Sequence, residues 1–169
     1  MGTCIQQVFA AVCQCTLMAN PAMGQQSFTI ADATTQGLSE FNTEVVLQST
    51  GETQGYVLAI GFDSSVLNAT NVSVEGSDVE NIGAELIAAE VLAEGLTLGV
   101  VLDAQSPFDG QVIPAGQATV GVLTFTPATI ATSNLTTQLS FADGVFNSPP
   151  LDNLIVQGGL SIGVADGLQ

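Results

Sequence analysis

Apolar and polar residues alternate in short runs along most of the chain, from residue 27 onward. The runs are rich in Val, Ile, Leu, Thr and Phe and are separated by Gly, Asn, Asp and Pro, which is typical of β-strands joined by turns. One side of the run at residues 55–62 carries Tyr56, Leu58, Ile60 and Phe62. We expect that side to face the core, because successive side chains of a strand point to opposite faces. The predicted strands cover residues 27–31, 44–48, 55–62, 71–75, 84–92, 96–102, 119–126, 136–141 and 154–162.

Nine short strands in one chain predict an all-β fold, a nine-stranded jelly-roll β-sandwich. Residues 96–102 are apolar on both sides, which suits a central strand of such a sandwich. The chain of 169 residues is long enough for one domain with its own core. No linker or internal repeat divides it, so we predict a single sandwich domain over residues 25–169.

Residues 79–95 give two conflicting signals. Their richness in Ala, Glu and Leu would, on propensity alone, predict a helix that ends at Gly95. Apolar positions also recur there with period two, at Ile82, Ala84, Leu86, Ala88 and Leu92. Because residues 93–95 also suit a hairpin loop, we predict a strand, with the helix as the alternative. Neither choice changes the fold class.

The first 24 residues resemble a secretory signal peptide. An interrupted apolar stretch at residues 8–19 is too short to span a bilayer and is followed by a break at 20–21. Residues 22–24 then place small side chains before a cut at Gln25. An ordinary signal peptide has a Lys or Arg before its apolar stretch, and none is present here. An N-terminal strand or amphipathic segment is therefore the alternative. We predict a secreted or cell-surface protein.

Cysteine usage agrees with export. All three cysteines, Cys4, Cys13 and Cys15, lie inside the predicted signal segment. The exported chain from Gln25 would therefore contain no cysteine and would need no disulfide.

The charge balance excludes several classes of function. The chain carries 16 acidic side chains and no Lys, Arg or His, for a net charge of −16. Nucleic-acid binding and phosphoryl transfer require cationic side chains, which are missing. Without His, a Ser-His-Asp triad and a His-ligated zinc site are excluded as well. The charge also repels anionic membranes, and neutral or cationic partners remain.

Carboxylates are the chain's remaining candidates for chemistry. Two pairs, Glu90 with Glu94 and Asp103 with Asp109, are conceivable acid/base pairs for glycoside hydrolysis, which needs two carboxyl groups about 5–10 Å apart. Sequence spacing does not fix such a distance across a sandwich, and solvated surface acids are the common case. We therefore predict no enzyme and no catalytic residue.

A hard cation is the more plausible ligand for the loop aspartates. Carboxylate and backbone oxygens at strand ends and in loops can converge on calcium. The candidate ligands are Asp103, Asp109 and Asp143. The chain has no D-x-D-x-D-G loop, so solvated turn aspartates are the alternative, and no other cofactor is predicted.

The order of the segments is similar to that of a known family. Residues 55–67 (GYVLAIGFDSSVL) resemble the cohesin signature, a strand of the form G-F-x-F-x-L-x-Y-D followed by P-x-V-L, with Ser64 where the family often has Pro. The chain also resembles later strands and turns of the family, at residues 71–74, 95–103, 113–116, 120–126 and 139–144. The resemblance covers residues 44–162.

This resemblance implies a jelly-roll sandwich, related in architecture to carbohydrate-binding modules, from a secreted bacterial protein. Cellulosomal members of the family bind a dockerin domain on one sheet face. We therefore predict a noncatalytic recognition module for a dockerin-type protein or a polysaccharide, without assigning its binding residues. The alternative is a structural subunit of a surface layer, filament or matrix that self-associates through strand edges, and the absence of every trypsin site suits that alternative.

Overall fold

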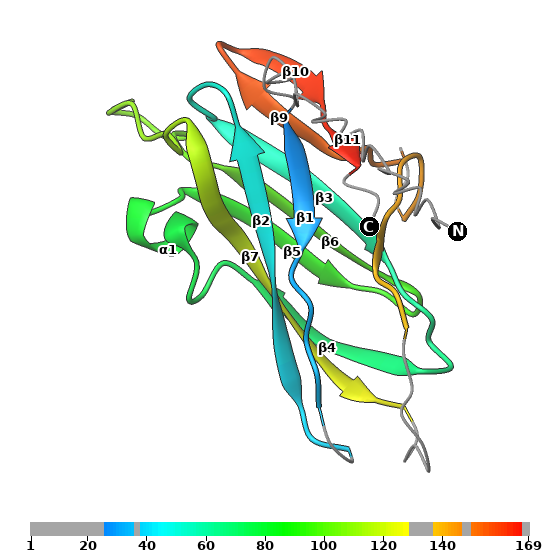
Figure 1. Cartoon of the computed structure of the whole chain (residues 1–169). Coiled ribbons are helices and arrows are strands. Elements are labelled where there is room, and N and C mark those ends of the chain that lie inside the picture. The colour runs from blue at the N-terminus through cyan, green and yellow to red at the C-terminus, as the bar shows by residue number, and fades with distance from the viewer. Residues whose placement is uncertain (1–25, 36–37, 129–136, 147–149, 167–169) are drawn as a thin grey trace, which may run out of the picture.

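The computed structural model describes residues 26–35, 38–128, 137–146 and 150–166. Over these residues the chain forms two packed β-sheets and one short helix (Figure 1). The elements are β1 (Ser27–Ile30), β2 (Phe41–Ser49), β3 (Gly55–Gly61), β4 (Leu67–Ser73), α1 (Asp78–Ile82), β5 (Leu86–Val91), β6 (Gly95–Val101), β7 (Gly116–Pro127), β8 (Ser140–Phe141), β9 (Leu154–Gln157), β10 (Leu160–Gly163) and β11 (Ala165–Asp166). The prediction of an all-β sandwich is confirmed.

The two sheets have different strand orders. One has five strands in the order β11-β1-β2-β7-β4. The other has six strands, five of them in the order β10-β9-β3-β6-β5. The sixth, β8, pairs with β3 on the same edge as β9 but further along the strand. All neighbouring strands are antiparallel except β1 and β11. The long central pairs β2–β7 and β3–β6 form the middle of the two layers.

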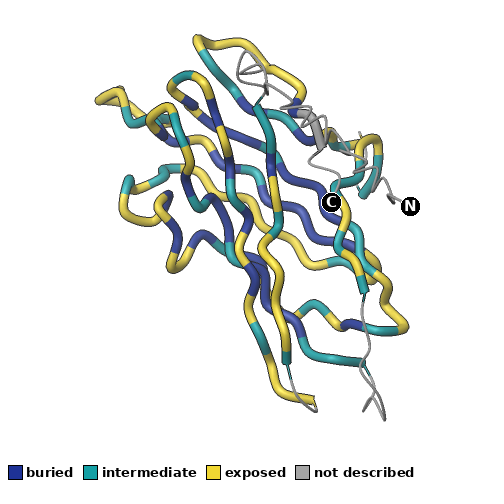
Figure 2. The backbone as a smooth tube through the Cα atoms, in the orientation of Figure 1, coloured by how far each residue is buried: buried dark blue, intermediate teal, exposed yellow. Residues whose placement is uncertain are grey.

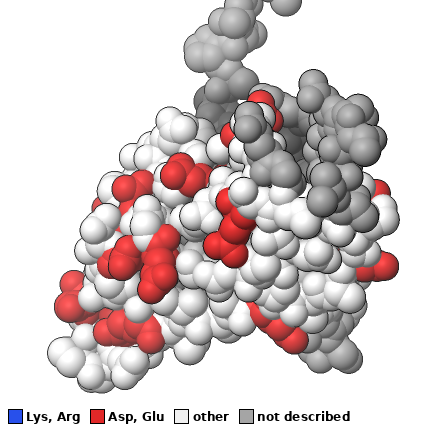
Figure 3. Space-filling view, turned by 90° about the horizontal axis from the view of Figure 1, so that it is seen from below, with Lys and Arg blue, Asp and Glu red and all other residues white. Residues whose placement is uncertain are grey.

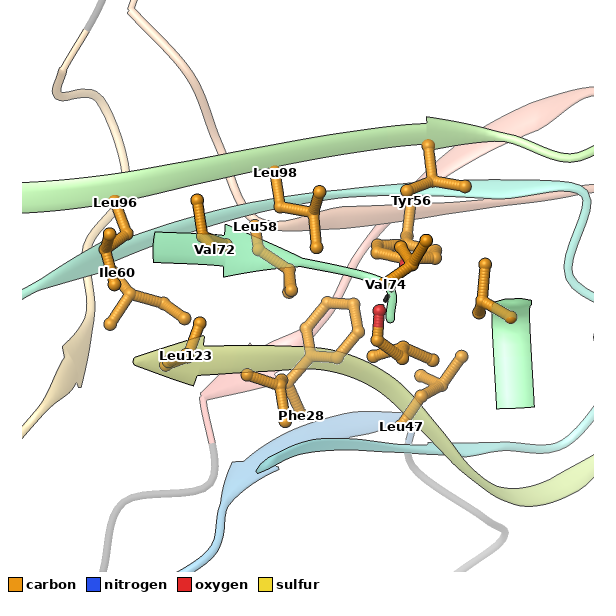
Figure 4. Packing of buried hydrophobic residues seen from close by; sticks show 14 of the residues in the cluster. Phe28, Leu47, Tyr56, Leu58, Ile60, Val72, Val74, Leu96, Leu98 and Leu123 are labelled. Atoms are coloured by element: carbon orange, nitrogen blue, oxygen red, sulfur yellow. Dashed lines mark hydrogen bonds between the residues drawn. The ribbon is translucent and has the colours of Figure 1, made fainter. Parts of the chain in front are cut away.

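The hydrophobic core fills the space between the sheets. Buried and exposed positions alternate along the strands (Figure 2). As predicted, Tyr56, Leu58 and Ile60 are fully buried, whereas Phe62 is partly buried and packs edge-on against Phe125. Figure 4 shows core residues of both layers facing one another, among them Leu58, Ile60, Leu96 and Leu98 from the six-stranded sheet and Phe28, Leu47, Val72 and Leu123 from the five-stranded sheet.

The ambiguous segment at residues 79–95 contains both a helix and a strand. α1 begins after Ser77, whose side chain accepts a hydrogen bond from the Glu80 N–H, and ends at Gly83 in the left-handed region (φ 83°). β5 follows and turns into β6 over residues 92–94. The predicted strand and hairpin are thus confirmed, but the strand is shorter than predicted. The helical propensity is realised only in one turn that has a cap at each end.

Several predicted strand boundaries were wrong. The predicted strand 154–162 is a hairpin, β9 and β10, because Gly158 and Gly159 both adopt positive φ and allow a tight turn. The strand predicted at 71–75 lies at Leu67–Ser73, and the one predicted at 136–141 is reduced to Ser140–Phe141 among the described residues. β11 was not predicted. The described part of the chain therefore has eleven strands rather than nine.

The predicted signal segment and its cysteines lie outside the described residues. Among the residues that are described, none of the helical structure is long and apolar enough to cross a membrane.

Candidate binding face

The outer face of the five-stranded sheet is mostly polar. Buried Val45 and Leu47 on β2 and buried Leu123 and Phe125 on β7 point into the core, so the residues between them point outward. The outward residues include Asn42, Glu44, Val46 and Gln48 on β2, Val122 and Thr126 on β7, and Asn68, Asn71 and Ser73 on β4. This composition is typical of a sheet face that stays in water.

Much of the outer face of the six-stranded sheet is apolar instead. Strand register places two rows of outward residues side by side across β5, β6, β3 and β9. The first row is Leu86, Val101, Gly55 and Val156, and the second is Ala88, Gly99, Val57 and Leu154. We call these eight positions the apolar face. The side chain of Leu86 is 54% exposed and that of Val101 is 40% exposed, so the apolar character reaches solvent.

The far end of the same sheet surface is closed by an aromatic ring. Gly61 and Gly95 are register partners, and a Cβ added to Gly95 would collide with the ring of Phe146. Phe146 itself adopts φ 67°, a conformation that costs free energy for a residue with a Cβ. The ring therefore covers the glycine pair. Between this pair and the apolar face lies the row Glu90, Thr97 and Ala59, in which Thr97 and Ala59 are buried and Glu90 is exposed.

A hollow of about 400 Å³ lies where the first row meets the β6–β7 loop. Val101, Gly55 and Val156 line one side of it, and Phe108, 72% exposed, lines another. Its remaining lining residues are Gln54, Asp103, Gly110, Gln111 and Val112.

The loop that carries Phe108 is fixed to the sheet at its base. Thr53 and Ile113 exchange two backbone hydrogen bonds of 2.9 Å. The Leu102 N–H donates to the Gln54 carbonyl at 3.0 Å, and the Gly110 N–H donates to Oδ2 of Asp103 at 2.9 Å. These contacts hold the hollow at one end of the apolar face.

The predicted calcium ligands lie in two different loops. Asp103 and Asp109 belong to the β6–β7 loop, whereas Oδ1 of Asp143 accepts hydrogen bonds from the backbone and side chain of Asn153, at 2.7 and 2.9 Å. No three acidic side chains among the described residues are grouped so that they could hold a metal ion. Calcium binding therefore stays a prediction.

Asp143 has a structural contact instead. The Asn153 side chain that it holds accepts a hydrogen bond from the Ala59 N–H at 2.8 Å. Ala59 lies between the part of β3 that pairs with β9 and the part that pairs with β8. The Asn153 amide thus takes the place of a missing ladder bond in a buried position.

The acidic side chains are spread over the surface with no cationic side chain among them. Figure 3 shows several on the face seen from below. Asp63 follows β3, and the side chain and backbone N–H of Ser65 donate to its Oδ1 at 2.6 and 2.9 Å, which lowers the pKa of Asp63. Of the candidate acid/base pairs, Glu90 lies on β5 and Glu94 in the turn that follows it, whereas Asp103 and Asp109 both lie in the β6–β7 loop.

Sequence reasoning missed the residues of the apolar face. The available signal was the lack of polar residues on the outward side of two adjacent strands, residues 55–61 and 95–101, where Thr97 is the single polar side chain. The apolar residues on both sides of 96–102 predict a central strand, which β6 is, but they do not indicate that one of its sides is open. Phe108 gave no periodic signal, because it lies in a loop.

No family model matches the sequence, and no curated protein matches it. Solved structures of cohesins do match its fold. The sixth cohesin of scaffoldin B from Acetivibrio cellulolyticus, in complex with a Cel5 dockerin mutant, matches with a TM-score of 0.63 at 9% identity, over 85% of this chain and 94% of that chain. A cohesin of a type II cohesin-X-dockerin complex from the same organism matches with a TM-score of 0.60 at 17% identity, over 85% and 93%.

A non-cellulosomal cohesin also has this fold. It comes from the hyperthermophilic archaeon Archaeoglobus fulgidus and matches with a TM-score of 0.54 at 14% identity, over 85% of this chain and 86% of that chain. The described chain therefore has the jelly-roll fold of cohesin domains, and the resemblance noted in the sequence is confirmed at the level of fold.

Proposed function

We propose that this chain is a noncatalytic, extracellular recognition module that binds a dockerin-type protein through the apolar face. The observation that carries the proposal is the difference between the two outer faces, one polar and one apolar and open. Contiguous exposed apolar surface on a soluble domain marks interaction sites. Cohesins with the same fold are bound to dockerins in solved structures, which supports a protein partner.

The charge of the chain restricts which partner fits. At a net charge of −16, an acidic partner would be repelled, whereas a basic one would be attracted and its association accelerated. The apolar face would supply affinity through burial, and the surrounding acids would select for a cationic rim on the partner. The surface offers less for binding a polysaccharide, because Phe108 is the only large aromatic side chain exposed among the described residues.

A matched pair of substitutions tests the proposal. Val57 and Val46 are both half-buried, outward-pointing valines on inner strands, one on the apolar face and one on the polar sheet. We expect Val57→Glu to weaken dockerin binding by about 2 kcal/mol or more, because it buries a charge at the contact. Val46→Glu should leave binding unchanged.

The measurement is calorimetric titration with the dockerin domains of the source genome and those of the matching cohesin complexes. Equal loss in both variants would place the contact elsewhere. If no dockerin binds the unsubstituted chain, the proposed partner class is wrong.

A second candidate function follows from the edge of the same sheet. Leu86, Ile87 and Val91 of β5 are all exposed, and β5 has a partner strand on one side only among the described residues. An exposed apolar edge strand is a site for strand pairing between copies. This observation favours assembly into a surface layer or filament as the alternative.

A further inference from the structure

Asp103 is unusual among the acidic groups of the described residues. Its Oδ2 accepts from the Gly110 N–H, but its Oδ1 is closed off from solvent and has no hydrogen-bond donor within the described part of the chain. A carboxylate oxygen that has lost water without gaining a donor is unfavourable. Because the Asp103 side chain as a whole is only partly buried and lines the hollow, a cation there can still neutralise the charge that its two oxygens share.

Other acids of the fold obtain their donors from the chain itself. Asp143 is bound by Asn153, Asp152 Oδ1 by the Gly144 N–H and Asp78 Oδ2 by the Thr119 N–H. The chain has no Lys, Arg or His with which to neutralise any of them. A cation that pairs with Asp103 must come from another molecule.

The hollow around Asp103 has apolar walls. Val101 and Val156 line one part, and the exposed ring of Phe108 lines another. A straight aliphatic stem can pack along such walls while its charged end meets a carboxylate, and an ammonium group also gains from a nearby aromatic ring. The hollow adjoins the first row of the apolar face, so a partner bound there would have side chains within reach of it.

We propose that this hollow binds one lysine side chain of the protein partner, with the ammonium group at Asp103 and the stem against Val101, Val156 and Phe108. The inference rests on the proposed function, since it places the hollow at the edge of the same contact. Lysine fits better than arginine, because one oxygen of Asp103 already holds the Gly110 N–H and a guanidinium favours two oxygens together.

The test uses small probes in place of the unidentified partner. The isotope-labelled full chain is titrated with N-acetyl-lysine methylamide and followed by NMR at the amides of Val101, Phe108, Gly110 and Val156. N-acetyl-norleucine methylamide has the same stem without the ammonium group, and the arginine analogue has the competing cation. We expect saturable shifts at these amides with the lysine probe and weaker binding of the other two.

Two variants separate a specific site from general attraction to an acidic protein. Asp103→Asn keeps an oxygen for the Gly110 N–H but removes the charge, and it should lower the affinity for the lysine probe by about tenfold. Glu44→Gln removes one charge from the opposite sheet and should leave the affinity unchanged. Shifts spread over the whole surface, or equal effects of the two variants, would overturn the proposal.

The probe experiment is independent of the dockerin titration. Lysine binding without any dockerin binding would remove the proposed partner class and keep the site. Dockerin binding that depends on Val57 but not on Asp103, with no response to the lysine probe, would remove the lysine site and keep the face.

Discussion

Single residues bridge places where the strand pattern is interrupted. The Ala59 N–H lies between two pairing partners of β3, and Asn153 accepts its hydrogen bond while Asp143 holds Asn153 in place. Elsewhere on β3, the hydroxyl group of Tyr56 donates to the Val120 carbonyl on β7 and so links the two sheets (Figure 4). Both contacts are buried, so neither donor nor acceptor can turn to water instead.

Asn153→Ala should lower the free energy of unfolding by about 1–3 kcal/mol, because it leaves the buried Ala59 N–H without an acceptor. Urea denaturation of the variant and of the unsubstituted chain measures the loss. Asn42→Ala, at an exposed position of β2, is the control and should change stability by less than about 0.5 kcal/mol. A loss no larger at residue 153 than at residue 42 would contradict the assigned contact.

Tyr56 should make stability depend on alkaline pH. Burial raises the pKa of Tyr56 well above its usual value, whereas in the unfolded chain it is about 10. Stability is therefore independent of this group below about pH 10, where the hydroxyl is neutral in both states. Above pH 10 the hydroxyl ionises in the unfolded chain first, so the free energy of unfolding falls by about 1.4 kcal/mol per pH unit. Tyr56→Phe should remove this particular fall.

Tyr56 is the chain's only tyrosine, so tyrosinate absorbance follows its ionisation without interference. Ionisation near pH 10 in the folded chain would show that the hydroxyl is accessible to solvent.

At the scale of elements, the sequence predicts strands better than it predicts their ends. Alternation placed Tyr56, Leu58 and Ile60 in the core, because a buried side chain leaves its pattern in the strand itself. Residues 154–162 were predicted as one strand, although Gly158 and Gly159 divide them, because two glycines can also occur inside an edge strand. The one-turn helix α1 depends on its caps at Ser77 and Gly83, and these signals are weaker than the period-two pattern around them.

The candidate binding face was harder to predict than the fold. Its two rows are built from four strands far apart in the sequence, so no local pattern unites Leu86, Val101 and Val156. The order of strands in the sheet brings them together. The hollow likewise depends on the course of the β6–β7 loop, where the sequence predicted only the candidate calcium ligands Asp103 and Asp109 and resembled a family turn at 113–116.

The exposed edge strand β5 yields a prediction about assembly. If copies pair through it, sedimentation velocity should show association that grows with protein concentration and with salt, since salt screens the repulsion between chains of net charge −16. Ile87→Glu should abolish the association, whereas Leu38→Glu, at an exposed position outside the strands, should not. A monomer at all concentrations and salt levels would reject the alternative function.

For the whole molecule, the absence of cations matters more than any single acid. Sixteen acidic groups without a countercharge repel one another across the fold, and salt shortens the range of that repulsion from about 30 Å at 0.01 M to about 8 Å at 0.15 M. The melting temperature should therefore rise with ionic strength.

Calcium and magnesium should raise the melting temperature equally if they act by screening alone. The predicted calcium site requires more than this. It requires a larger rise with calcium than with magnesium at equal ionic strength, and loss of the difference in Asp143→Asn or Asp103→Asn. Calorimetric scans in the two salts decide between screening and a site.

The most direct test of the account is to map which sheet a bound partner touches. Both outer faces carry methyl groups, Val57 and Val101 on the apolar face and Val46 and Val122 on the opposite sheet. In a methyl cross-saturation experiment with a bound dockerin, we expect signal loss at Val57 and Val101 and none at Val46 and Val122. Signal loss at Val46 and Val122 with Val57 and Val101 unaffected would contradict the claim that the apolar face is the binding surface.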